Sequence, residues 1–553
     1  MTRKSFLLAF VGAVLSKVYK ERAVTSDLAV SSKIGNKILE KGGNSVDAAI
    51  ATAVAVGAIN AFASGIGGGG FMLVRQPDGA MRGYNFRETA PALAEPGRYR
   101  VRGDSLRGRR SVAVPGEIRG LYMAHKEHGK MKWAELFHDT IEMLESGFEV
   151  PPVLGDKLRE FEDVILKDKG LFDTYTKKGK VVRAGDVITR KNFAKTLSVL
   201  ARDPESFYTG EIAKSLLSFI NQNGECITAS DFSGYAAVET SPLIFQHDNL
   251  TISTLGIPTC GYMGIVALLS MKLVSSEHPV LSEKEFQNLL IVLYSHLYHI
   301  RKGLEDTRDE HLNRKDLNAK VFNTAYISKL LMLLKSSVDS DVGLFAESAQ
   351  ELLVDHGTTH VNVVDKDGMM VSLTSTINNY WGSGLMDPST GVILNDQIDD
   401  FLFQYTNMNG LSGDREDVAS HVLKNTILAH RRPLSSSMPI IVQDGKNFYI
   451  TGGSGGIRIP TTVISVLSRI MFRNTPIGEA VDFPRVHMQG GNKVYVERAY
   501  PRKHLSRGLE VVLDNPMKIH SCLHIISANY SSAKGCRIET ATDGRKKGGC
   551  AGV

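Results

Sequence analysis

The chain has 553 residues, of which 42% are hydrophobic and 22% are charged. These proportions are ordinary for a folded protein and exclude intrinsic disorder as its main state. The formal net charge is only +6, which argues against a dedicated nucleic-acid-binding protein with a concentrated basic patch. At about 150 residues per domain, the length allows three to four domains or one large layered α/β unit.

The N-terminus carries a short apolar segment. Arg3 and Lys4 precede the run Ser5–Ser16 (SFLLAFVGAVLS), and basic residues follow it from Lys17 onward. A helix of that length rises about 18 Å, which is too short for the roughly 30 Å hydrocarbon core of a bilayer. The segment predicts a cleavable signal peptide over residues 1–16 and hence a secreted, extracellular protein. The alternative is a short signal anchor that holds the protein outside the plasma membrane.

Two other features bear on a secretory route. Sequons occur at Asn249 (Asn-Leu-Thr) and Asn529 (Asn-Tyr-Ser), which we expect to be glycan sites on the surface of a secreted chain. The five cysteines show no CxxC pair and no zinc pattern in their spacing. We therefore expect mostly isolated structural thiols and no metal site.

The first elements in chain order are two helices between residues 31 and 60. Apolar residues recur there mostly every four positions, and the pair Gly42-Gly43 interrupts the pattern. Asn44 or Ser45 is placed to cap the second, alanine-rich helix.

The glycine run Ser64–Phe71 (SGIGGGGF) comes next. Neither a Lys-Ser/Thr pair nor a helical pattern follows it, which argues against a phosphate-binding loop and favours a close backbone approach beside a strand. Residues 120–350 have mainly helical periodicity, apart from Leu243–Leu255, which predicts two short strands.

A β-hairpin is predicted around the turn Asp365–Gly368 (DKDG), because two half-alternating runs flank it. With the turn centred there, Thr358 lies opposite Ser375 or Thr376, depending on whether the turn contains a bulge. The sequence therefore places two hydroxyl side chains at one end of one hairpin.

The dipeptide Gly357-Thr358 is suited to self-cleavage. A β-hydroxyl can attack the preceding peptide carbonyl to form an ester, and Gly357 has no Cβ to shield that carbonyl. Hydrolysis would leave Thr358 with a hydroxyl nucleophile and an α-amine whose pKa is about 7.7–8.0, close enough to neutrality for it to act as the base. By local sequence alone, the better explanation of Thr358 and Thr359 is that they are β-forming residues at the start of a strand.

Ordered motifs elsewhere distinguish these interpretations. They are Gly42–Ala49, Ser64–Leu73, Asn85–Pro91, Ser111–Gly120, Thr358–His360, Thr374–Asn378, Asn395–Phe401, Pro433–Ser436 and Gly455-Gly456. Through these motifs the chain resembles the γ-glutamyltransferase family, self-cleaving N-terminal-nucleophile hydrolases that take the γ-glutamyl group from glutathione. The resemblance implies an α/β (α+β) fold, the four-layer αββα sandwich, formed jointly by a large subunit (17–357) and a small catalytic subunit (358–553).

The resemblance also implies catalytic roles. Thr358 matches the nucleophile of both self-cleavage and transfer, with the cut between Gly357 and Thr358. Thr376 matches the hydroxyl that bonds the nucleophile. Gly455 and Gly456 match the pair whose backbone N–H groups form the oxyanion hole, where one donor contributes roughly 3–4 kcal/mol to lowering the barrier.

The substrate-binding residues implied by the resemblance surround a zwitterion. Arg87 matches the residue that binds the α-carboxylate, a task for which the planar guanidinium is better suited than lysine. Asp400 matches the carboxylate that holds the α-ammonium. The other matching positions are Asn378 and Gln397 around the zwitterion, and Ser435 and Ser436 at the α-carboxylate.

The implied activity is that of a γ-glutamyltransferase and glutathione hydrolase without a metal or organic cofactor. Its partners would be glutathione and other γ-glutamyl compounds, with water, amino acids or dipeptides as acceptors, and no nucleic acid. Two alternatives remain: a related acylase, and a catalytically silent secreted relative acting as a binding protein or effector. The segment Ile257–Gly261 (IPTCG) departs from the Pro-Pro-Ser-Gly-Gly-like turn of the family, which puts the local geometry and the acceptor preference in question.

Overall fold

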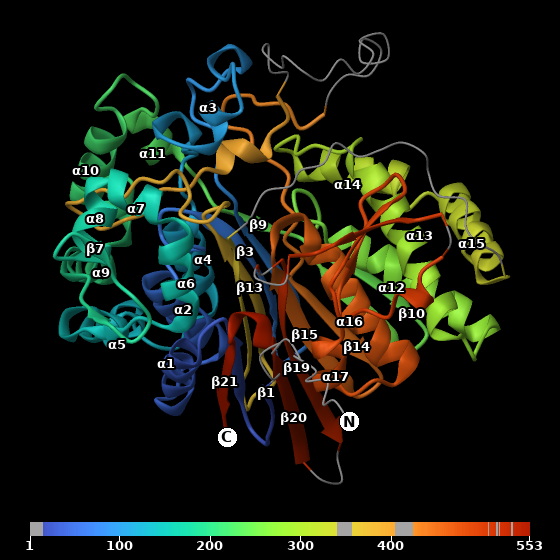
Figure 1. Cartoon of the computed structure of the whole chain (residues 1–553). Helices are drawn as coiled ribbons and strands as arrows, with labels where there is room; N and C mark the ends of the chain where they lie inside the picture. Colours follow the sequence, from blue (N-terminus) through green and yellow to red (C-terminus); the bar gives the residue numbers. More distant parts are fainter. Residues whose placement is uncertain are drawn as a thin grey trace, which may run out of the picture.

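Two antiparallel sheets lie face to face in the middle of the protein, with helices on both outer sides (Figure 1). The computed structural model describes residues 15–339, 357–403, 424–506, 508–515, 518, 520–531 and 535–553. Residues 1–14, which hold most of the expected signal peptide, lie outside this range. Within the described part of the chain, no helix is both long and apolar enough to cross a membrane.

The first sheet has seven strands and contains the predicted hairpin. In spatial order its strands are β21 (Gly549–Gly552), β2 (Ala23–Ser26), β12 (Thr359–Val364), β13 (Met370–Thr376), β3 (Gly69–Arg75), β4 (Met81–Phe86) and β9 (Val238–Thr240). The second sheet also has seven: β1 (Leu15–Tyr19), β20 (Gly535–Thr542), β19 (Cys522–Ser531), β15 (Asn447–Ser454), β14 (Ile440–Asp444), β11 (Leu250–Thr254) and β10 (Leu243–His247). Each sheet combines strands from before and after residue 357, so the two expected subunits are interlocked.

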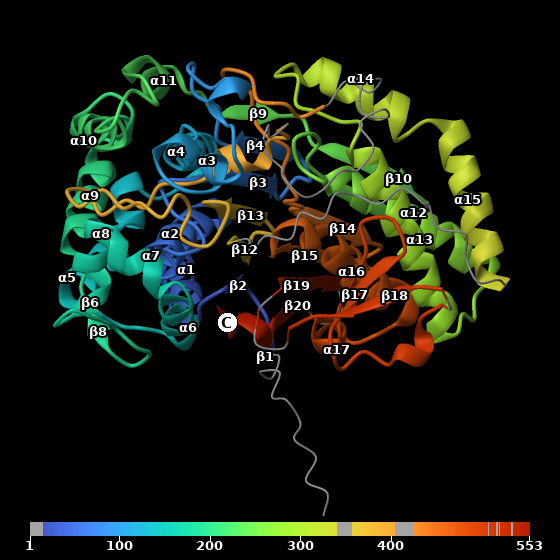
Figure 2. The same ribbon diagram turned by 45° about the horizontal axis from the view of Figure 1, so that its top comes forward.

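Helices cover the outer face of each sheet, as Figure 2 shows from a second direction. On the first sheet lie α1 (Ala29–Glu40), α2 (Ser45–Ile59) and α4 (Glu117–His128); on the second lie α12 (Gly261–Glu277), α16 (Ile459–Arg473) and α17 (Ile477–Asp482). Helix α13 (Glu283–Arg301) packs outside α12, beside α15 (Thr324–Asp339). The expected αββα sandwich is confirmed.

The remaining elements are shorter or peripheral. The helices are α3 (Gly103–Leu106), α5 (His138–Ser146), α6 (Pro152–Glu160), α7 (Glu162–Lys167), α8 (Lys169–Tyr175), α9 (Lys191–Arg202), α10 (Glu211–Ile220), α11 (Ala229–Gly234) and α14 (Glu310–Lys320). The strands are β5 (Phe148–Glu149) with β8 (Val187–Ile188), β6 (Thr176–Lys177) with β7 (Lys180–Val181), and β16 (Val486–His487), β17 (Lys493–Val496) and β18 (Glu510–Leu513).

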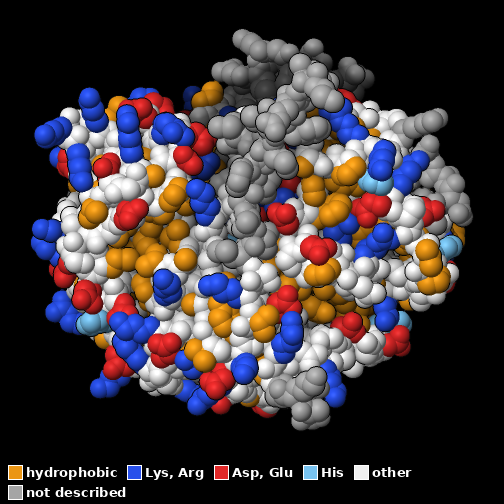
Figure 3. Space-filling model, turned by 60° about the horizontal axis from the view of Figure 1, so that its bottom comes forward, with side chains coloured by type: hydrophobic (Ala, Val, Ile, Leu, Met, Phe, Trp, Pro, Cys, Tyr) orange, Lys and Arg blue, Asp and Glu red, His pale blue; other side chains and the backbone are white. Residues whose placement is uncertain are grey.

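Apolar burial explains why the layers stay together. One core lies between the first sheet and its helices, a second between the other sheet and its helices, and a third between the two sheets, where Phe71, Val364 and Ile450 are buried. Burying such side chains contributes about 1.5–3 kcal/mol each. Acidic and basic side chains are interspersed on the face shown in Figure 3.

The local predictions agree with these elements. Asn44 caps α2 by accepting from the backbone N–H groups of Val46 and Asp47, and Asp47 completes a capping box. The glycine run leads into β3, where a Cβ on Gly68 would lie 2.0 Å from the Thr376 carbonyl oxygen. The close backbone approach expected for the run is therefore confirmed, and it occurs at the end of the predicted hairpin.

Candidate active site

The end of the β12–β13 hairpin holds the residues expected for self-cleavage. The register pairs Thr359 with Ser375, so Thr358 and Thr376 are the next pair, one of the two registers that the sequence allowed. Their hydroxyl oxygens are 3.3 Å apart. Both hydroxyls donate to the Gly357 carbonyl oxygen, Thr358 Oγ1 at 2.7 Å and Thr376 Oγ1 at 2.8 Å.

The peptide at Gly357 is held from both sides. Its N–H donates to the Asn378 carbonyl at 2.7 Å, and the Asn378 N–H donates to Thr376 Oγ1 at 2.9 Å. Asn378 itself has a φ of 73°, a left-handed conformation that costs a non-glycine residue free energy and is typical of constrained functional sites. Because Thr376 accepts from Asn378, its own proton is directed at the Gly357 carbonyl oxygen, where it would stabilise negative charge.

Lys546 lies beneath this end of the hairpin and is 2% exposed. Its Nζ donates to the Thr358 carbonyl and to Ser454 Oγ, at 2.7 Å in each case, and Asp27 Oδ2 lies 3.4 Å away. Burial alone would raise the pKa of Asp27, but Lys546 and His524 outweigh burial and lower it. A fixed ammonium this close to Thr358 disfavours protonation of an amine formed on that residue.

Ser454 connects the nucleophile to the predicted oxyanion hole, because β15 ends there and Gly455-Gly456 follow. Gly455 has a φ of 118° and Gly456 a φ of 55°, and α16 begins a few residues later at Ile459. A Cβ on Gly455 would lie 2.4 Å from the His520 carbonyl oxygen. Only glycine fits there, and the backbone N–H groups ahead of a helix N-terminus favour an anion.

Arg87 and Asp400, the two residues predicted to bind the opposite charges of the substrate zwitterion and called the clamp below, contact each other. Arg87 follows β4 and is 1% exposed, while Asp400 ends the 3-10 helix η5 (Gln397–Asp400) with its side chain 23% exposed. Arg87 donates from NH2 to Asp400 Oδ2, and Gln397 Nε2 donates to the same oxygen at 2.6 Å. The buried Gln397 Oε1 has no hydrogen-bond partner among the described residues, so it can accept from an ammonium group.

The clamp and the nucleophile belong to one network. Asn378 Nδ2 donates to the carbonyl of Asp396, the residue before Gln397, at 3.0 Å. At the other end, Arg87 NH2 donates to the Leu434 carbonyl at 3.0 Å. Hydrogen bonds therefore join the clamp both to the hairpin and to the loop of residues 433–437, called the serine loop below.

The two predicted serines differ in orientation. Ser435 Oγ donates to Ser437 Oγ at 3.0 Å and also accepts from the Ser437 N–H at 3.1 Å, so this hydroxyl is engaged within its own loop. Ser436 Oγ instead accepts from Arg301 NH2 at 3.4 Å. Of the two hydroxyls, that of Ser436 is the one oriented toward a cation.

Sequence reasoning missed three charged groups near the site: Lys546, Arg301 and Glu88. Glu88 directly follows Arg87 in the motif Asn85–Pro91, so its position was a signal that went unused, whereas Lys546 and Arg301 lie in segments without a motif. Glu88 is fully buried, and neither carboxyl oxygen has a hydrogen-bond partner among the described residues. Burial, against the opposing effect of Arg87, raises the pKa of Glu88 to about 7.

His360 lies in β12 and takes no direct part in the site. Its Nδ1 lies 2.9 Å from Thr374 Oγ1 and its Nε2 lies 2.9 Å from Asn362 Oδ1. Burial lowers the pKa of His360 to about 3, so it is neutral at physiological pH.

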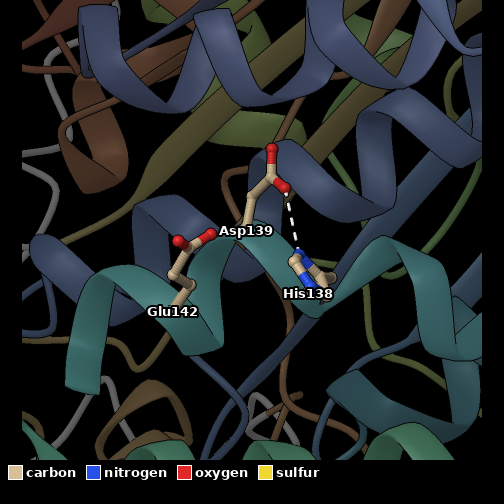
Figure 4. A group of neighbouring side chains, drawn as sticks. All are labelled: His138, Asp139 and Glu142. Atoms are coloured by element: carbon tan, nitrogen blue, oxygen red, sulfur yellow. Dashed lines mark hydrogen bonds and ion pairs between the residues drawn. The ribbon is translucent and has the colours of Figure 1, made fainter. Parts of the chain in front are cut away.

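Within the described residues, one group of side chains has the spacing of metal ligands: His138, Asp139 and Glu142 on α5 (Figure 4). Lys37 Nζ lies 2.7 Å from Asp139 Oδ2, and Lys41 Nζ lies 3.8 Å from Oδ1. The Asp139 carboxylate is thus already neutralised by two lysines, and the group is not assigned to a metal.

The two sequons lie in different settings. Asn249 is exposed on the turn between β10 and β11, as expected of a surface glycan site. Asn529 is half-buried in β19 and pairs with Asn447 on one side and Arg537 on the other. Asn249 therefore lies at the surface as expected, whereas Asn529 is only partly exposed, because the neighbouring strands β15 and β20 flank it.

A family model and several known proteins are similar to this chain. A family model described as Gamma-glutamyltranspeptidase matches residues 31–553. The chain is 35% identical over 493 residues to Glutathione hydrolase proenzyme 1 of Schizosaccharomyces pombe, covering 86% of this chain and 76% of that one. It is also 33% identical over 493 residues to Scoloptoxin SSD14 of Scolopendra dehaani, covering 85% and 82%.

Among solved structures, the cephalosporin acylase from Bacillus halodurans is similar over 100% of this chain and 99% of its own, with a TM-score of 0.81. The sequence identity is 22%, so the likeness concerns the fold.

Proposed function

The chain belongs to the gamma-glutamyltranspeptidase family, and on that basis we propose that it is a self-cleaving γ-glutamyltransferase that hydrolyses glutathione and other γ-glutamyl compounds. The γ-glutamyl group passes through a Thr358 ester to water, an amino acid or a dipeptide. One observation carries the proposal. The Thr358 hydroxyl donates to the carbonyl of the preceding residue, Gly357, and hydrogen bonds connect this threonine to the Arg87–Asp400 pair, whose charges complement those of a zwitterion.

Self-cleavage begins when Thr358 Oγ1 attacks the Gly357 carbonyl carbon. The oxygen–carbon bond forms and the carbon–nitrogen bond breaks, while the proton lost by the hydroxyl is transferred to the nitrogen, which becomes the α-amine of Thr358. Thr376 donates to the carbonyl oxygen at 2.8 Å, where negative charge develops. Water then hydrolyses the ester, leaving a carboxyl group on Gly357 and a free hydroxyl on Thr358.

Transfer reuses the same hydroxyl. The substrate replaces the Arg87–Asp400 ion pair by presenting its α-carboxylate to Arg87 and its α-ammonium to Asp400, which sets the distance from the γ-carbonyl to Thr358. The α-amine of Thr358 accepts the hydroxyl proton during attack and returns it to the leaving amine. The backbone N–H groups of Gly455 and Gly456 bind the oxyanion, and an acceptor then releases the acyl group.

Two alternatives lead to different expectations. A related acylase would take acyl groups without an amino-acid end, for which the charges of Arg87 and Asp400 have no use. A silent effector, a possibility to which the toxin name of one relative draws attention, would remain uncut or inactive. Every residue that matches a family site is present here, which favours the active enzyme.

The decisive experiment combines a denaturing gel with an activity assay. Purified protein is expected to give two fragments, one ending at Gly357 and one consisting of residues 358–553, and to hydrolyse L-γ-glutamyl p-nitroanilide. Thr358→Ala is expected to give one uncut, inactive chain, whereas Thr358→Ser keeps the hydroxyl and is expected to cleave. A wild-type chain that stays continuous at the junction yet turns over glutathione would refute the proposal.

The secretory route remains part of the proposal. A signal peptide over residues 1–16 would remove Leu15 and Ser16, the first residues of β1, and leave the rest of that strand paired with β20. The exposed Asn249 is then the expected glycan site, with Asn529 the poorer acceptor. N-terminal sequencing of the large fragment from a secretory host distinguishes a cleaved signal from a retained anchor.

A further inference from the structure

The C-terminal end of α13 lies against both loops of the candidate site. Tyr294 OH donates to the Thr461 carbonyl at 3.0 Å, and Tyr298 OH donates to the Ile457 carbonyl, immediately after Gly455-Gly456. The last residue of the helix, Arg301, then reaches the serine loop. Helix α13 belongs to the segment before the cleavage junction, and both loops belong to the segment after it.

Among the residues that the structure describes, the guanidinium of Arg301 has only long, weak hydrogen bonds. NH1 lies 3.4 Å from Cys260 Sγ and 3.4 Å from the Ser435 carbonyl, and NH2 lies 3.4 Å from Ser436 Oγ. Well-formed N–H···O bonds are about 2.7–3.2 Å long. The N–H groups of Arg301 that face Ser436 can therefore form stronger hydrogen bonds to another acceptor.

Arg301 forms no ion pair within the described residues, and the carboxylate that acts on it electrostatically, that of Asp400, is bound to Arg87. The acidic side chains that follow Arg301 are engaged elsewhere: Glu305 pairs with Lys424 at 2.7 Å and with Arg431 at 2.9 Å, and Asp306 accepts from Asn313 at 2.8 Å.

The nearest sulfur does not supply the missing charge either. Burial, against the opposing effect of Arg301, raises the pKa of the Cys260 thiol, so the thiol stays neutral. Cys260 lies in the segment Ile257–Gly261, which departs from the family turn. A thiol is a weak acceptor, so Cys260 satisfies the Arg301 guanidinium only weakly.

We infer that Arg301 is a second guanidinium of the donor's α-carboxylate subsite and acts beside Arg87 and Ser436 as a specificity-determining residue. The inference rests on the proposed function. A half-buried, unpaired guanidinium gains most from a carboxylate, because charge-assisted hydrogen bonds are the strong ones. Asp400 forms an ion pair with Arg87 and acts on Arg301 only from a longer distance, so Arg301 is the less compensated of the two guanidinium groups, and together they select donors that carry an α-carboxylate.

The test measures how well competitors bind to self-cleaved protein that hydrolyses L-γ-glutamyl p-nitroanilide. L-Glutamate and 4-aminobutyrate share an amine and the distal carboxylate, and they differ only in the α-carboxylate. In Arg301→Gln, the inhibition constant of glutamate is expected to rise about tenfold or more, while that of 4-aminobutyrate stays within about twofold. Arg301→Lys keeps the charge without the fork and is expected to lie between.

The exposed neighbouring residue provides a matched control, since Lys302→Gln removes a positive charge at the next position and is expected to leave both constants unchanged. Equal weakening of both competitors in Arg301→Gln would indicate a purely structural role and overturn the inference, as would no change in either. If Arg301→Gln fails to self-cleave, Arg301→Lys decides, and a wild-type ratio of the two constants then overturns it. Wild-type protein without γ-glutamyl hydrolysis would instead refute the proposed function.

Discussion

Thr376 donates its hydroxyl proton to the Gly357 carbonyl oxygen at 2.8 Å, the oxygen that Thr358 Oγ1 also contacts at 2.7 Å. The geometry gives Thr376 a role before the cut as well as after it. Before the cut it stabilises charge on the carbonyl of the junction, and afterwards it is a hydrogen-bond partner for the nucleophile.

Thr376→Val is therefore expected to slow self-cleavage by about tenfold or more, because it removes one oxyanion donor. Valine keeps the shape of the side chain in a buried strand, so the fold should persist. The measurement is the fraction of uncut chain over time on a denaturing gel. Thr376→Ser, which retains the hydroxyl, is expected to cleave near the wild-type rate, and a valine variant that cleaves as fast as wild type would contradict the role.

The clamp is expected to be separable from self-cleavage. Arg87→Ala and Asp400→Asn should still give two fragments, because neither side chain contacts the junction. Each should lower kcat/KM for L-γ-glutamyl p-nitroanilide by about 100-fold or more, since each removes the group that pairs with one charge of the substrate and leaves that charge uncompensated. The adjacent Asp399→Asn is the control and should keep near-normal turnover. Unchanged turnover in Arg87→Ala would remove Arg87 from the substrate site.

Gly455 is expected to be intolerant of a side chain. Gly455→Ala introduces a Cβ that would lie 2.4 Å from the His520 carbonyl oxygen, at a φ of 118°. Displacing the loop should lower kcat by about 100-fold, with a smaller effect on KM, because the lost interaction exists mainly in the transition state.

The matched control for this substitution is Gly445→Ala. Gly445 also has a positive φ, 59°, but nothing lies within 4 Å of its Cβ position, so its alanine variant should keep normal kcat. Steady-state kinetics of both variants decide the matter. Wild-type kcat in Gly455→Ala would exclude this loop as the oxyanion hole.

The raised pKa of Glu88 predicts that the stability of the folded protein depends on pH. Its pKa is raised from 4.5 to about 7 by burial, so the folded protein binds the Glu88 proton more tightly than the unfolded chain does. The stabilisation from the protonated form is fully present below about pH 4.5 and is lost as the pH rises through about 7. Glu88→Gln, which imitates the protonated acid, should therefore raise Tm relative to wild type at pH 8, with the difference shrinking toward pH 5.

Thermal melts of wild type and Glu88→Gln across this range isolate the contribution of the one carboxyl group from that of the histidines. Glu95→Gln serves as the control, because Glu95 is exposed and its substitution should not change the pH dependence. A Tm difference that is constant with pH would show that Glu88 does not titrate in this window.

The sequence by itself determined the features that depend on neighbouring residues. Helices α1 and α2, the Asn44 cap, the strands β10 and β11, and the β12–β13 hairpin all follow from periodicity and turn chemistry, which act over a few positions. The hairpin arithmetic brought Thr358 to within one residue of its partner. Assigning roles to Arg87, Asp400 and the glycine pair required ordered family motifs, because no local rule joins residues so far apart.

Only the tertiary structure decided which of the alternatives and which additional groups matter. It selected Thr376 over Ser375 as the partner of Thr358, and Ser436 over Ser435 as the hydroxyl oriented toward a cation. It also brought Lys546 under the nucleophile and Arg301 to the serine loop. The physical reason is that the burial of a side chain and the compensation of its charge depend on all layers of the sandwich at once. Each sheet contains strands from both sides of the junction, so these contacts form only in the folded protein.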